Sequence, residues 1–366
     1  MEKKLYQKVF DDLEELIKAG QYPVGDKLPS EGELALTYNV SAITIKRALQ
    51  ELSNLGYISR KPKQGTFVIA NEKETSLSLA IDCKLPVLGC IFTNFDDTFG
   101  TKILSGIIDN ATNKAHIIVK KSMGDIQKEE ALIQELLEIN ISGIILLPCS
   151  SKYLSPNIIE LVYKNFPIVI VDRSLESIPI SSVTSNNKEG MEQLITYLFA
   201  TDHQNIGMIT SSLVVSSIEE RLQGYIQAHA ANQLKMNPDL TKHIITSVIP
   251  SSNVSPEEDI QSIINFIADH PEMTAIAASE YNIALLIKQA CEEIGKRVPE
   301  DISIVCFDHP DDFFNKQAFR FTHIKQNQHD LGRESLNQIL RQIKAPTSIT
   351  KIALSGELII GDSTKK

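Results

Sequence analysis

Positive charge is concentrated in one short stretch of an acidic chain. The 366 residues carry a formal net charge of −10, yet residues 40–68 contain one acidic residue, Glu51, and five basic ones: Lys46, Arg47, Arg60, Lys61 and Lys63. Lysine and arginine side chains bind phosphate oxygens through charge-assisted hydrogen bonds, and such contacts position proteins on duplex DNA. We therefore expect this stretch to contact DNA phosphates. The alternative interpretation is a solvated helical domain with incidental basic residues.

A second group of candidate residues follows strand-like apolar runs in the larger part of the chain. Carboxylates and guanidinium groups pair with hydroxyl groups, and an aromatic face covers the C–H side of a sugar ring. The candidates are Asp97, Phe99, Asp172, Arg173, Arg221 and Asp308. Each of them alone could be a cap, an ion-pair partner or a packing residue. Together they fit a small polyol.

Cysteine and histidine do not follow a metal-binding pattern. The five cysteines include no CxxC pair, and the eight histidines show no HExxH or HxxxH spacing. We interpret the cysteines as reduced and structural. The sequence also lacks a GxSxG, a GxGxxG and a P-loop, so we expect no metal, no cofactor and no enzyme activity. A sugar-processing enzyme is the less favoured alternative.

The basic residues lie on elements that the sequence pattern predicts. Ser30 and Glu33 form a capping box for a short helix, and Ser41 is the N-cap candidate of the next helix. That second helix carries an apolar stripe, so Lys46 and Arg47 point away from the core. The runs "YISRK" and "GTFVIA" with "PKQG" between them predict a hairpin. We therefore expect a helix-turn-helix followed by a wing.

This stretch resembles the GntR family of winged helix-turn-helix repressors. The resemblance is carried by "LPSEGELA", "VSAITIKRALQEL" and "GTFV", although Ala42 and Lys46 stand where the family usually has arginine. It implies that operator DNA is contacted by the second helix and the wing. The implied DNA-binding residues are Ser30, Glu31, Ser41, Ala42, Ile43, Thr44, Lys46, Arg47, Arg60, Lys63, Gln64 and Gly65.

From residue 86 onward, strand-like and helical segments alternate along the chain. Runs such as "VLGCIFT", "GIILLP", "PIVIVD" and "ISIVCF" are each followed by a helical pattern. Repeated strand–helix units predict parallel sheets covered by helices, and such sheets bind ligands at the carboxyl ends of their strands. We therefore expect an α/β fold in which two lobes face each other across a cleft.

The larger part of the chain resembles the effector domains of LacI/GalR regulators and related periplasmic sugar-binding proteins. The runs "GIIDNA", "PIVIVDR", "RLQGY", "VPEDISIVCFD" and "QHDLG" occur in the family's order. The resemblance implies that Asp172, Arg173, Arg221 and Asp308 contact the effector and that Phe99 packs on it. Asp97 and Tyr281 are further candidates for effector contact. Glu280 and Tyr281 stand where the family usually has Asn-Asp, Cys306 replaces a glycine and Gly361 an arginine.

These features predict three segments. Residues 1–70 form the winged helix-turn-helix, 71–85 a linker, and 86–366 the effector and dimerisation domain. We expect lobe 1 to comprise about 86–185 and 310–345, and lobe 2 about 186–309 and 346–366. The charge divides in the same way, with a net charge of +1 in residues 1–70 and −11 in the remainder.

The predicted function is a homodimeric transcriptional repressor that a small sugar releases from a pseudo-palindromic operator. The pairing of such a head with such a body resembles a group of arabinose-responsive repressors, which implies L-arabinose as the first candidate effector. Another pentose, a hexose or a sugar phosphate are the alternatives. No apolar run approaches the roughly 20 residues of a membrane span, and the N-terminus is amphipathic and acidic. We expect a cytoplasmic protein without a membrane partner.

Overall fold

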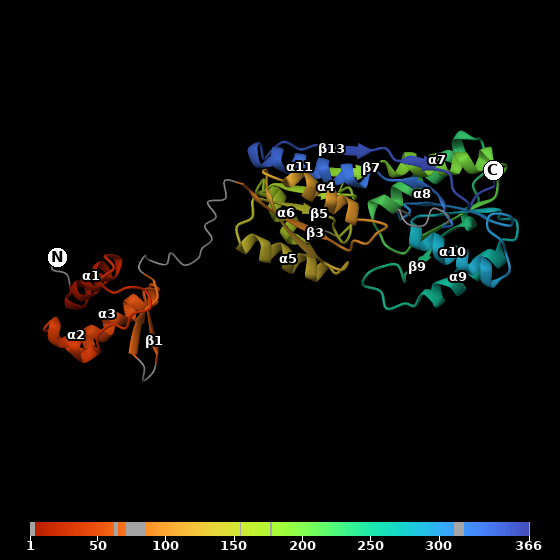
Figure 1. Cartoon of the computed structure of the whole chain (residues 1–366). Helices are drawn as coiled ribbons and strands as arrows, with labels where there is room; N and C mark the ends of the chain where they lie inside the picture. Colours follow the sequence, from red (N-terminus) through yellow and green to blue (C-terminus); the bar gives the residue numbers. More distant parts are fainter. Residues whose placement is uncertain are drawn as a thin grey trace. The chain divides into compact units, whose positions relative to one another are not determined.

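The chain divides into two compact units, which the computed structural model describes over residues 4–61, 65–70, 85–153, 155–175, 178–310 and 318–365 (Figure 1). The first unit comprises Met1–Lys84 and the second Leu85–Lys366. Each unit has its own buried apolar core. They are called the head and the body below.

The head consists of three helices and a two-stranded hairpin. Its elements are α1 (Leu5–Lys18), α2 (Glu31–Thr37), α3 (Ala42–Asn54), β1 (Ile58–Lys61) and β2 (Gly65–Val68). The predicted capping box is present, because Ser30 Oγ accepts from Glu33 N at 3.3 Å and Ser30 N donates to the Glu33 carboxylate at 2.7 Å. Ser41 Oγ caps α3 by accepting from Thr44 N at 3.3 Å.

The core of the head explains why α3 presents its basic residues outward. The apolar stripe of α3 is fully buried against α1 and α2, at Ile45, Ala48, Leu49 and Leu52. Gly56 then ends the helix with φ +79°, a conformation that suits glycine. The β1–β2 ladder is antiparallel and pairs Ile58 with Val68. The predicted helix-turn-helix and hairpin are therefore confirmed.

The body contains two six-stranded sheets, one in each lobe. The sheet of lobe 1 has the order β13-β7-β6-β5-β3-β4, and that of lobe 2 the order β14-β12-β11-β10-β8-β9. All pairings are parallel except β12 with β14. The strands of lobe 1 are β3 (Val87–Phe92), β4 (His116–Lys121), β5 (Gly143–Leu146), β6 (Ile168–Val171), β7 (Ser181–Ser185) and β13 (Lys351–Leu354). Those of lobe 2 are β8 (Ile206–Ser211), β9 (Thr241–Ile245), β10 (Ala275–Ala278), β11 (Ser303–Phe307), β12 (Thr322–Lys325) and β14 (Glu357–Ile359).

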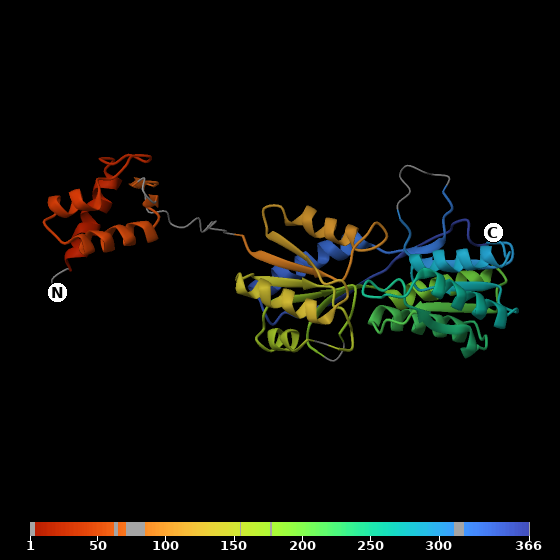
Figure 2. The ribbon, with the colours of Figure 1, turned by 90° about the horizontal axis from the view of Figure 1, so that it is seen from below.

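Helices cover both faces of each sheet, as Figure 2 shows. In lobe 1, α4 (Thr101–Ala111) and α11 (Gln328–Lys344) share one apolar cluster with the sheet, and α5 (Ile126–Glu138) and α6 (Pro156–Tyr163) share another. In lobe 2, α7 (Asn187–Ala200) and α8 (Ser216–Ala231) lie opposite α9 (Pro256–Asp269) and α10 (Tyr281–Glu293). A short 3-10 helix spans Pro238–Leu240. The expected α/β class is confirmed.

The predicted lobe boundaries near residues 310 and 345 are wrong. Strand β12, expected in lobe 1, pairs with β11 of lobe 2, and β13, expected in lobe 2, pairs with β7 of lobe 1. The chain therefore crosses between the lobes after β7, after β12 and between β13 and β14. A short strand pattern shows that a segment is extended, whereas its sheet is set by backbone pairing with residues far away in the sequence.

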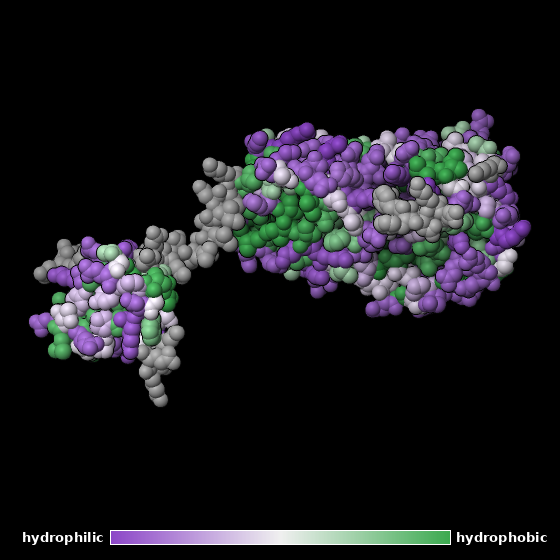
Figure 3. Space-filling model, in the orientation of Figure 1, coloured by the Kyte–Doolittle hydropathy of each residue, from purple (hydrophilic) through white to green (hydrophobic). Residues whose placement is uncertain are grey.

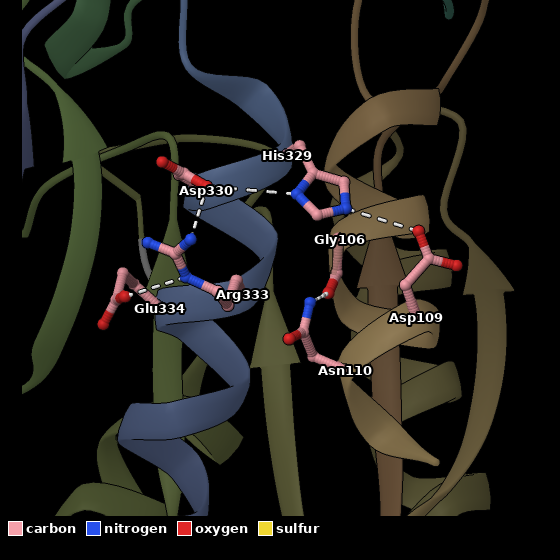
Figure 4. A network of polar contacts seen from close by, with 7 residues as sticks. All are labelled: Gly106, Asp109, Asn110, His329, Asp330, Arg333 and Glu334. Atoms are coloured by element: carbon pink, nitrogen blue, oxygen red, sulfur yellow. Dashed lines mark hydrogen bonds and ion pairs between the residues drawn. The ribbon is translucent and has the colours of Figure 1, made fainter.

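Helices α4 and α11 approach each other closely in lobe 1. A Cβ atom on Gly106 would lie 2.0 Å from the His329 carbonyl oxygen, and one on Gly332 would lie 2.0 Å from the Ile103 carbonyl oxygen. Figure 4 shows one polar side-chain contact between the two helices beside this crossing. There His329 Nε2 lies 3.3 Å from an oxygen of Asp109. Glycine is required at both crossing points because any side chain would separate the backbones.

Candidate ligand cavity and nucleic-acid-binding surface

A cavity of about 160 Å³ lies where the carboxyl ends of the two sheets face each other. Its wall includes the first residue after several strands, among them Thr93, Asp172, Ser279, Asp308 and Gln326. The volume is below the roughly 300–1,000 Å³ typical of pockets for drug-sized ligands, so an occupant of monosaccharide size fits it better than a nucleotide does.

The structure brings six of the seven predicted effector residues to this cavity. They are Phe99, Asp172, Arg173, Arg221, Tyr281 and Asp308. The seventh, Asp97, does not line the cavity, whereas its neighbour Asp96 does, although both residues are exposed. The reason is a local turn, in which Asp96 Oδ1 accepts from the backbone nitrogens of Thr98 at 2.8 Å and Phe99 at 3.1 Å. This turn holds the Asp96 side chain at the cavity and leaves Asp97 outside.

Arg221 projects from α8 into the cavity wall and is 7% exposed. Its Nε donates to Asn187 Oδ1 at 2.9 Å, and another guanidinium nitrogen donates to the Ser279 carbonyl oxygen. The guanidinium group also lies 3.8 Å from the centroid of the Phe307 ring. These three contacts fix the side chain before any ligand arrives, so little conformational entropy remains to be lost on binding.

Asp172 and Arg173 follow strand β6 and are both buried, with exposed fractions of 6% and 7%. Asp172 has φ +67°, a left-handed conformation that is rare outside glycine and asparagine. Its Oδ1 accepts no hydrogen bond from the residues that the structure describes, and Arg173 Nε likewise has no acceptor among them. Burial raises the pKa of Asp172, although Arg173 and Arg221 oppose this shift. Unsatisfied buried polar atoms in a cavity wall are suited to a polar ligand.

Asp308 follows β11 and also has a left-handed backbone, with φ +60°. Its carboxylate accepts from Gln326 Nε2 at 2.5 Å and from Gln328 Nε2 at 3.0 Å. Gln328 begins α11 of lobe 1, and its Oε1 accepts from Gly100 N at 3.1 Å. Burial raises the pKa of Asp308 to about 6, against the lowering effect of Arg221 and the two glutamines. One amide therefore connects the two lobes beside the cavity.

Further polar residues that were not predicted as effector contacts also line the cavity, among them Asp96, Glu280 and Gln326. Glu280 is the second residue after β10 and the N-cap of α10, and burial raises its pKa to about 7, with Arg221 opposing. Gln326 follows β12 directly. Its Oε1 has no hydrogen-bond donor among the described residues. These residues could have been predicted by applying the rule that ligands bind at strand ends to every polar residue that follows a strand.

The lobes also contact each other at the start of α8. Ser216 N donates to Ser151 Oγ at 2.9 Å, and Ser174 N donates to Ser216 Oγ at 2.8 Å. Glu220 accepts from Ser174 Oγ at 3.1 Å and from Asn187 Nδ2 at 2.9 Å. Because Asn187 also accepts from Arg221, the inter-lobe contacts and the cavity wall share one hydrogen-bond network.

In the head, α3 presents a polar face that the core does not cover. Ala42, Ile43, Lys46, Arg47 and Gln50 are exposed, and Ile43 is 81% exposed. Ser41 and Thr44 lie at the start of this helix, where their hydroxyl oxygens are 2.8 Å apart. A helix face of this kind matches the recognition helix of helix-turn-helix proteins, which enters the major groove.

Two of the predicted DNA-contacting arginines have partners within the head. Arg60 of β1 forms an ion pair with Glu31, another predicted DNA contact, and thereby joins the hairpin to α2. The Arg47 guanidinium lies 4.1 Å from the centroid of the Tyr6 ring. Gly65 has φ +122°, and Ser30 caps α2. Lys63 and Gln64 lie outside the described residues.

The described residues show neither a metal-binding cluster nor a disulfide among their cysteines. Within them no group of three or more His, Cys, Asp or Glu side chains could hold a metal ion. Cys90, Cys149, Cys291 and Cys306 are buried free thiols, while Cys83 lies outside the described part of the chain. None of the described helices is both long enough and apolar enough to span a membrane.

Family models match two parts of the chain. Residues 5–68 match the bacterial regulatory proteins of the gntR family, and residues 195–364 match the periplasmic binding protein-like domain. The first match spans the whole described head from α1 to β2. The second spans most of lobe 2, together with α11 and β13 of lobe 1.

Three proteins that this chain resembles in sequence or in structure are named as transcription regulators or repressors. The arabinose metabolism transcriptional repressor of Geobacillus stearothermophilus is 24% identical over 96% of this chain and 94% of its own length. A LacI family transcriptional regulator from Enterococcus faecium with bound ribose has a TM-score of 0.62 at 21% identity, over 76% of this chain and 98% of that one. The lac repressor dimer bound to operator has a TM-score of 0.63 at 21% identity, over 77% of this chain and 94% of that one.

The last two similarities establish the fold of the body, and the first extends along nearly the whole chain. Together with the two family models they account for both units seen in the structure. The chain therefore joins a helix-turn-helix segment that matches the gntR-family model to a body that matches the periplasmic binding protein-like model and shares its fold with the lac repressor.

Proposed function

We propose that this protein is a transcriptional repressor of carbohydrate-utilisation genes that leaves its operator when a small sugar binds in the body. The observation that carries the proposal is the pairing, in one chain, of a gntR-family head with a small cavity walled by carboxylates and arginines. The head supplies DNA affinity, and the cavity supplies ligand control. L-arabinose is the first candidate effector, because the relative that matches along nearly the whole chain is named for arabinose metabolism.

The cavity has the chemistry that sugar recognition needs. Asp172, Asp308 and Glu280 offer acceptors for hydroxyl donors, and Arg173 and Arg221 offer donors for ring and hydroxyl oxygens. Phe99 and Tyr281 provide aromatic surface that suits the C–H side of a sugar ring. Because both lobes contribute, a bound sugar would favour one arrangement of the lobes over others, and this difference is what can be coupled to DNA binding.

We also propose that the protein acts as a homodimer in the cytoplasm, where its operator DNA is found. One head offers a single recognition helix, and a symmetric pair of heads would read two half-sites at a fixed spacing. Figure 3 shows apolar surface gathered over α4 and the edge strand β4, where Ile108 is 48% exposed and Ile117 and Val119 are half-buried. The lac repressor with the same fold is a dimer on its operator. These observations support a second copy as the partner of that face.

The proposal is tested by measuring DNA and sugar binding on the same full-length preparation. Operator fragments are titrated by gel shift with and without L-arabinose, D-ribose and D-galactose, and each sugar is titrated by calorimetry with and without DNA. We expect one sugar to weaken DNA binding by about 5- to 150-fold, and DNA to weaken sugar binding by the same factor, since linkage is reciprocal. A sugar that binds the body and leaves DNA affinity unchanged, or tightens it, contradicts release as the mechanism.

A further inference from the structure

The charges of the cavity wall do not balance. Among the described residues that line it, four carry carboxyl groups, namely Asp96, Asp172, Glu280 and Asp308, and two carry guanidinium groups, Arg173 and Arg221. No lysine or histidine belongs to this lining. The wall therefore has a net charge of −2 when all six groups are ionised.

Each arginine already donates to a partner inside the protein, although Arg173 Nε has no acceptor among the described residues. Arg221 donates to Asn187 and to the Ser279 carbonyl oxygen, and Arg173 donates to the Pro148 carbonyl oxygen. Arg221 also stabilises the ionised forms of Asp308, Asp172 and Glu280. An anionic ligand would have to compete with three carboxylates for this one guanidinium group.

The hydrogen-bond acceptors of the cavity wall require hydrogen-bond donors from a ligand. Asp172 Oδ1 is buried without a hydrogen-bond donor among the described residues, and it belongs to a cavity-lining side chain that is 6% exposed. Burial raises the pKa of Asp308 to about 6 and that of Glu280 to about 7, so this wall already disfavours negative charge. A hydroxyl group supplies a donor without charge, whereas a carboxylate or phosphate ester supplies more acceptors and more negative charge.

We propose that the cavity selects uncharged sugars over sugar acids and sugar phosphates, and that Glu280 is the residue that sets this selectivity. The inference rests on the proposed sugar-binding function and narrows its ligand class. Without the carboxylate of Glu280, the wall would hold three carboxyl groups and two guanidinium groups, so its net charge would fall from −2 to −1 when all of them are ionised. This is why we assign the selectivity to Glu280. It comes from the start of α10 in lobe 2, facing the loops of lobe 1 that supply Asp96 and Arg173.

The test compares matched neutral and anionic sugars by calorimetry on the full-length protein. The pairs are D-ribose with D-ribose 5-phosphate and D-galactose with D-galacturonate, with L-arabinose as an additional neutral sugar. In the unmodified protein we expect the neutral member to bind at least about tenfold more tightly, because like charges in a desolvated site repel strongly. Glu280→Gln removes at nearly constant shape a carboxyl group that is ionised above its pKa of about 7, so at pH 8 the ratio should fall at least threefold. The control Glu219→Gln removes an exposed carboxylate of α8 outside the cavity lining and should keep the ratio unchanged.

Two results would overturn the charge selectivity while leaving a sugar-responsive repressor in place. One is an acid or phosphate that binds as tightly as its neutral counterpart and releases operator DNA. The other is an unchanged ratio in Glu280→Gln, which would assign the discrimination to ligand size. If neither neutral nor anionic sugars bind, the proposed function itself fails, and this inference fails with it.

Discussion

At the scale of single residues, Arg221 is the best-anchored cation of the cavity. We expect Arg221→Ala to reduce affinity for the effector sugar by roughly 10- to 100-fold, since a hydrogen bond to a charged group contributes about 1.5–3 kcal/mol. The head is unaltered, so DNA binding should persist and sugar should no longer release it. Calorimetry and gel shifts on the same protein measure both effects.

Two further variants separate a binding role for Arg221 from a structural one. Arg221→Lys keeps the charge beside Asp308 and should retain the fold and part of the sugar affinity. Arg297→Ala removes an exposed arginine of the same lobe that pairs with Asp301, and should change neither property. Normal sugar affinity and normal release in Arg221→Ala would make Arg221 a structural residue.

Asp308 makes the stability of the sugar-free body depend on pH. Its pKa is raised to about 6, above the roughly 3.9 of an unfolded aspartate, so the native state holds the proton more tightly. The resulting contribution to the free energy of unfolding is fully present below about pH 4 and is lost as the pH rises to about 6. It amounts to up to about 3 kcal/mol, at 1.36 kcal/mol per pKa unit. Glu280, with a pKa of about 7, acts in the same direction at higher pH.

Asp308→Asn removes this proton-binding site while keeping the side chain's shape. Between pH 4.5 and pH 7, urea unfolding should show the variant gaining stability relative to the unmodified protein. Asp269→Asn changes an exposed carboxylate at the end of α9 and should show no such trend. A stability difference for Asp308→Asn that stays constant with pH would contradict the assignment.

Asp172 and Asp308 of the candidate cavity could be predicted at this scale, because polar side chains directly after buried strands must lie at one edge of a sheet. Asp97 could not be told from Asp96, since a turn of a few backbone hydrogen bonds decides which of two adjacent carboxylates faces inward. Gln328 was also beyond prediction as a link between lobes, because its partners Gly100 and Asp308 are brought to it only by the tertiary fold.

At the scale of elements, α3 carries the DNA-binding prediction. Lys46→Ala should weaken operator binding and reduce the slope of log affinity against log salt by about one unit, because one phosphate contact and its released counterion are lost. Lys18→Ala is the matched control, since Lys18 lies on α1 and pairs with Glu14. Gel shifts across a salt series measure both slopes. An unchanged affinity and slope for Lys46→Ala would remove α3 from the interface.

The elements themselves were largely predictable, and their assembly was not. Caps such as Ser30 and Ser41 act within one helical turn, so the sequence alone indicates where α2 and α3 begin. Strands β12 and β13 were recognisable as extended segments in the same way. Their assignment to opposite sheets depends on registers with Val305 and Thr184, more than a dozen residues away in each case.

At the scale of the whole molecule, the dimer is the feature to test. Ile108→Asp places a charge in the apolar surface over α4 and β4, and we expect it to shift the protein towards monomer and to weaken operator binding through the loss of paired heads. Ile159→Asp changes a comparably exposed isoleucine of α6, on the other face of the sheet, and should leave the dimer intact. Sedimentation at micromolar concentration distinguishes these outcomes, and full operator affinity in a monomeric protein would contradict the model.

The three chain crossings between the lobes also determine the order in which the protein can be completed during synthesis. The head needs nothing beyond β2, so it can fold early on the ribosome. Neither sheet of the body receives its last strand until β13 and β14 emerge near the end of the chain. A late stop codon would therefore strip an edge strand from both lobes at once, leaving β7 and β12 unpaired on one side while sparing the head. Such truncated products would retain DNA-binding heads without a complete body. In a cell they would act as repressors that do not respond to sugar.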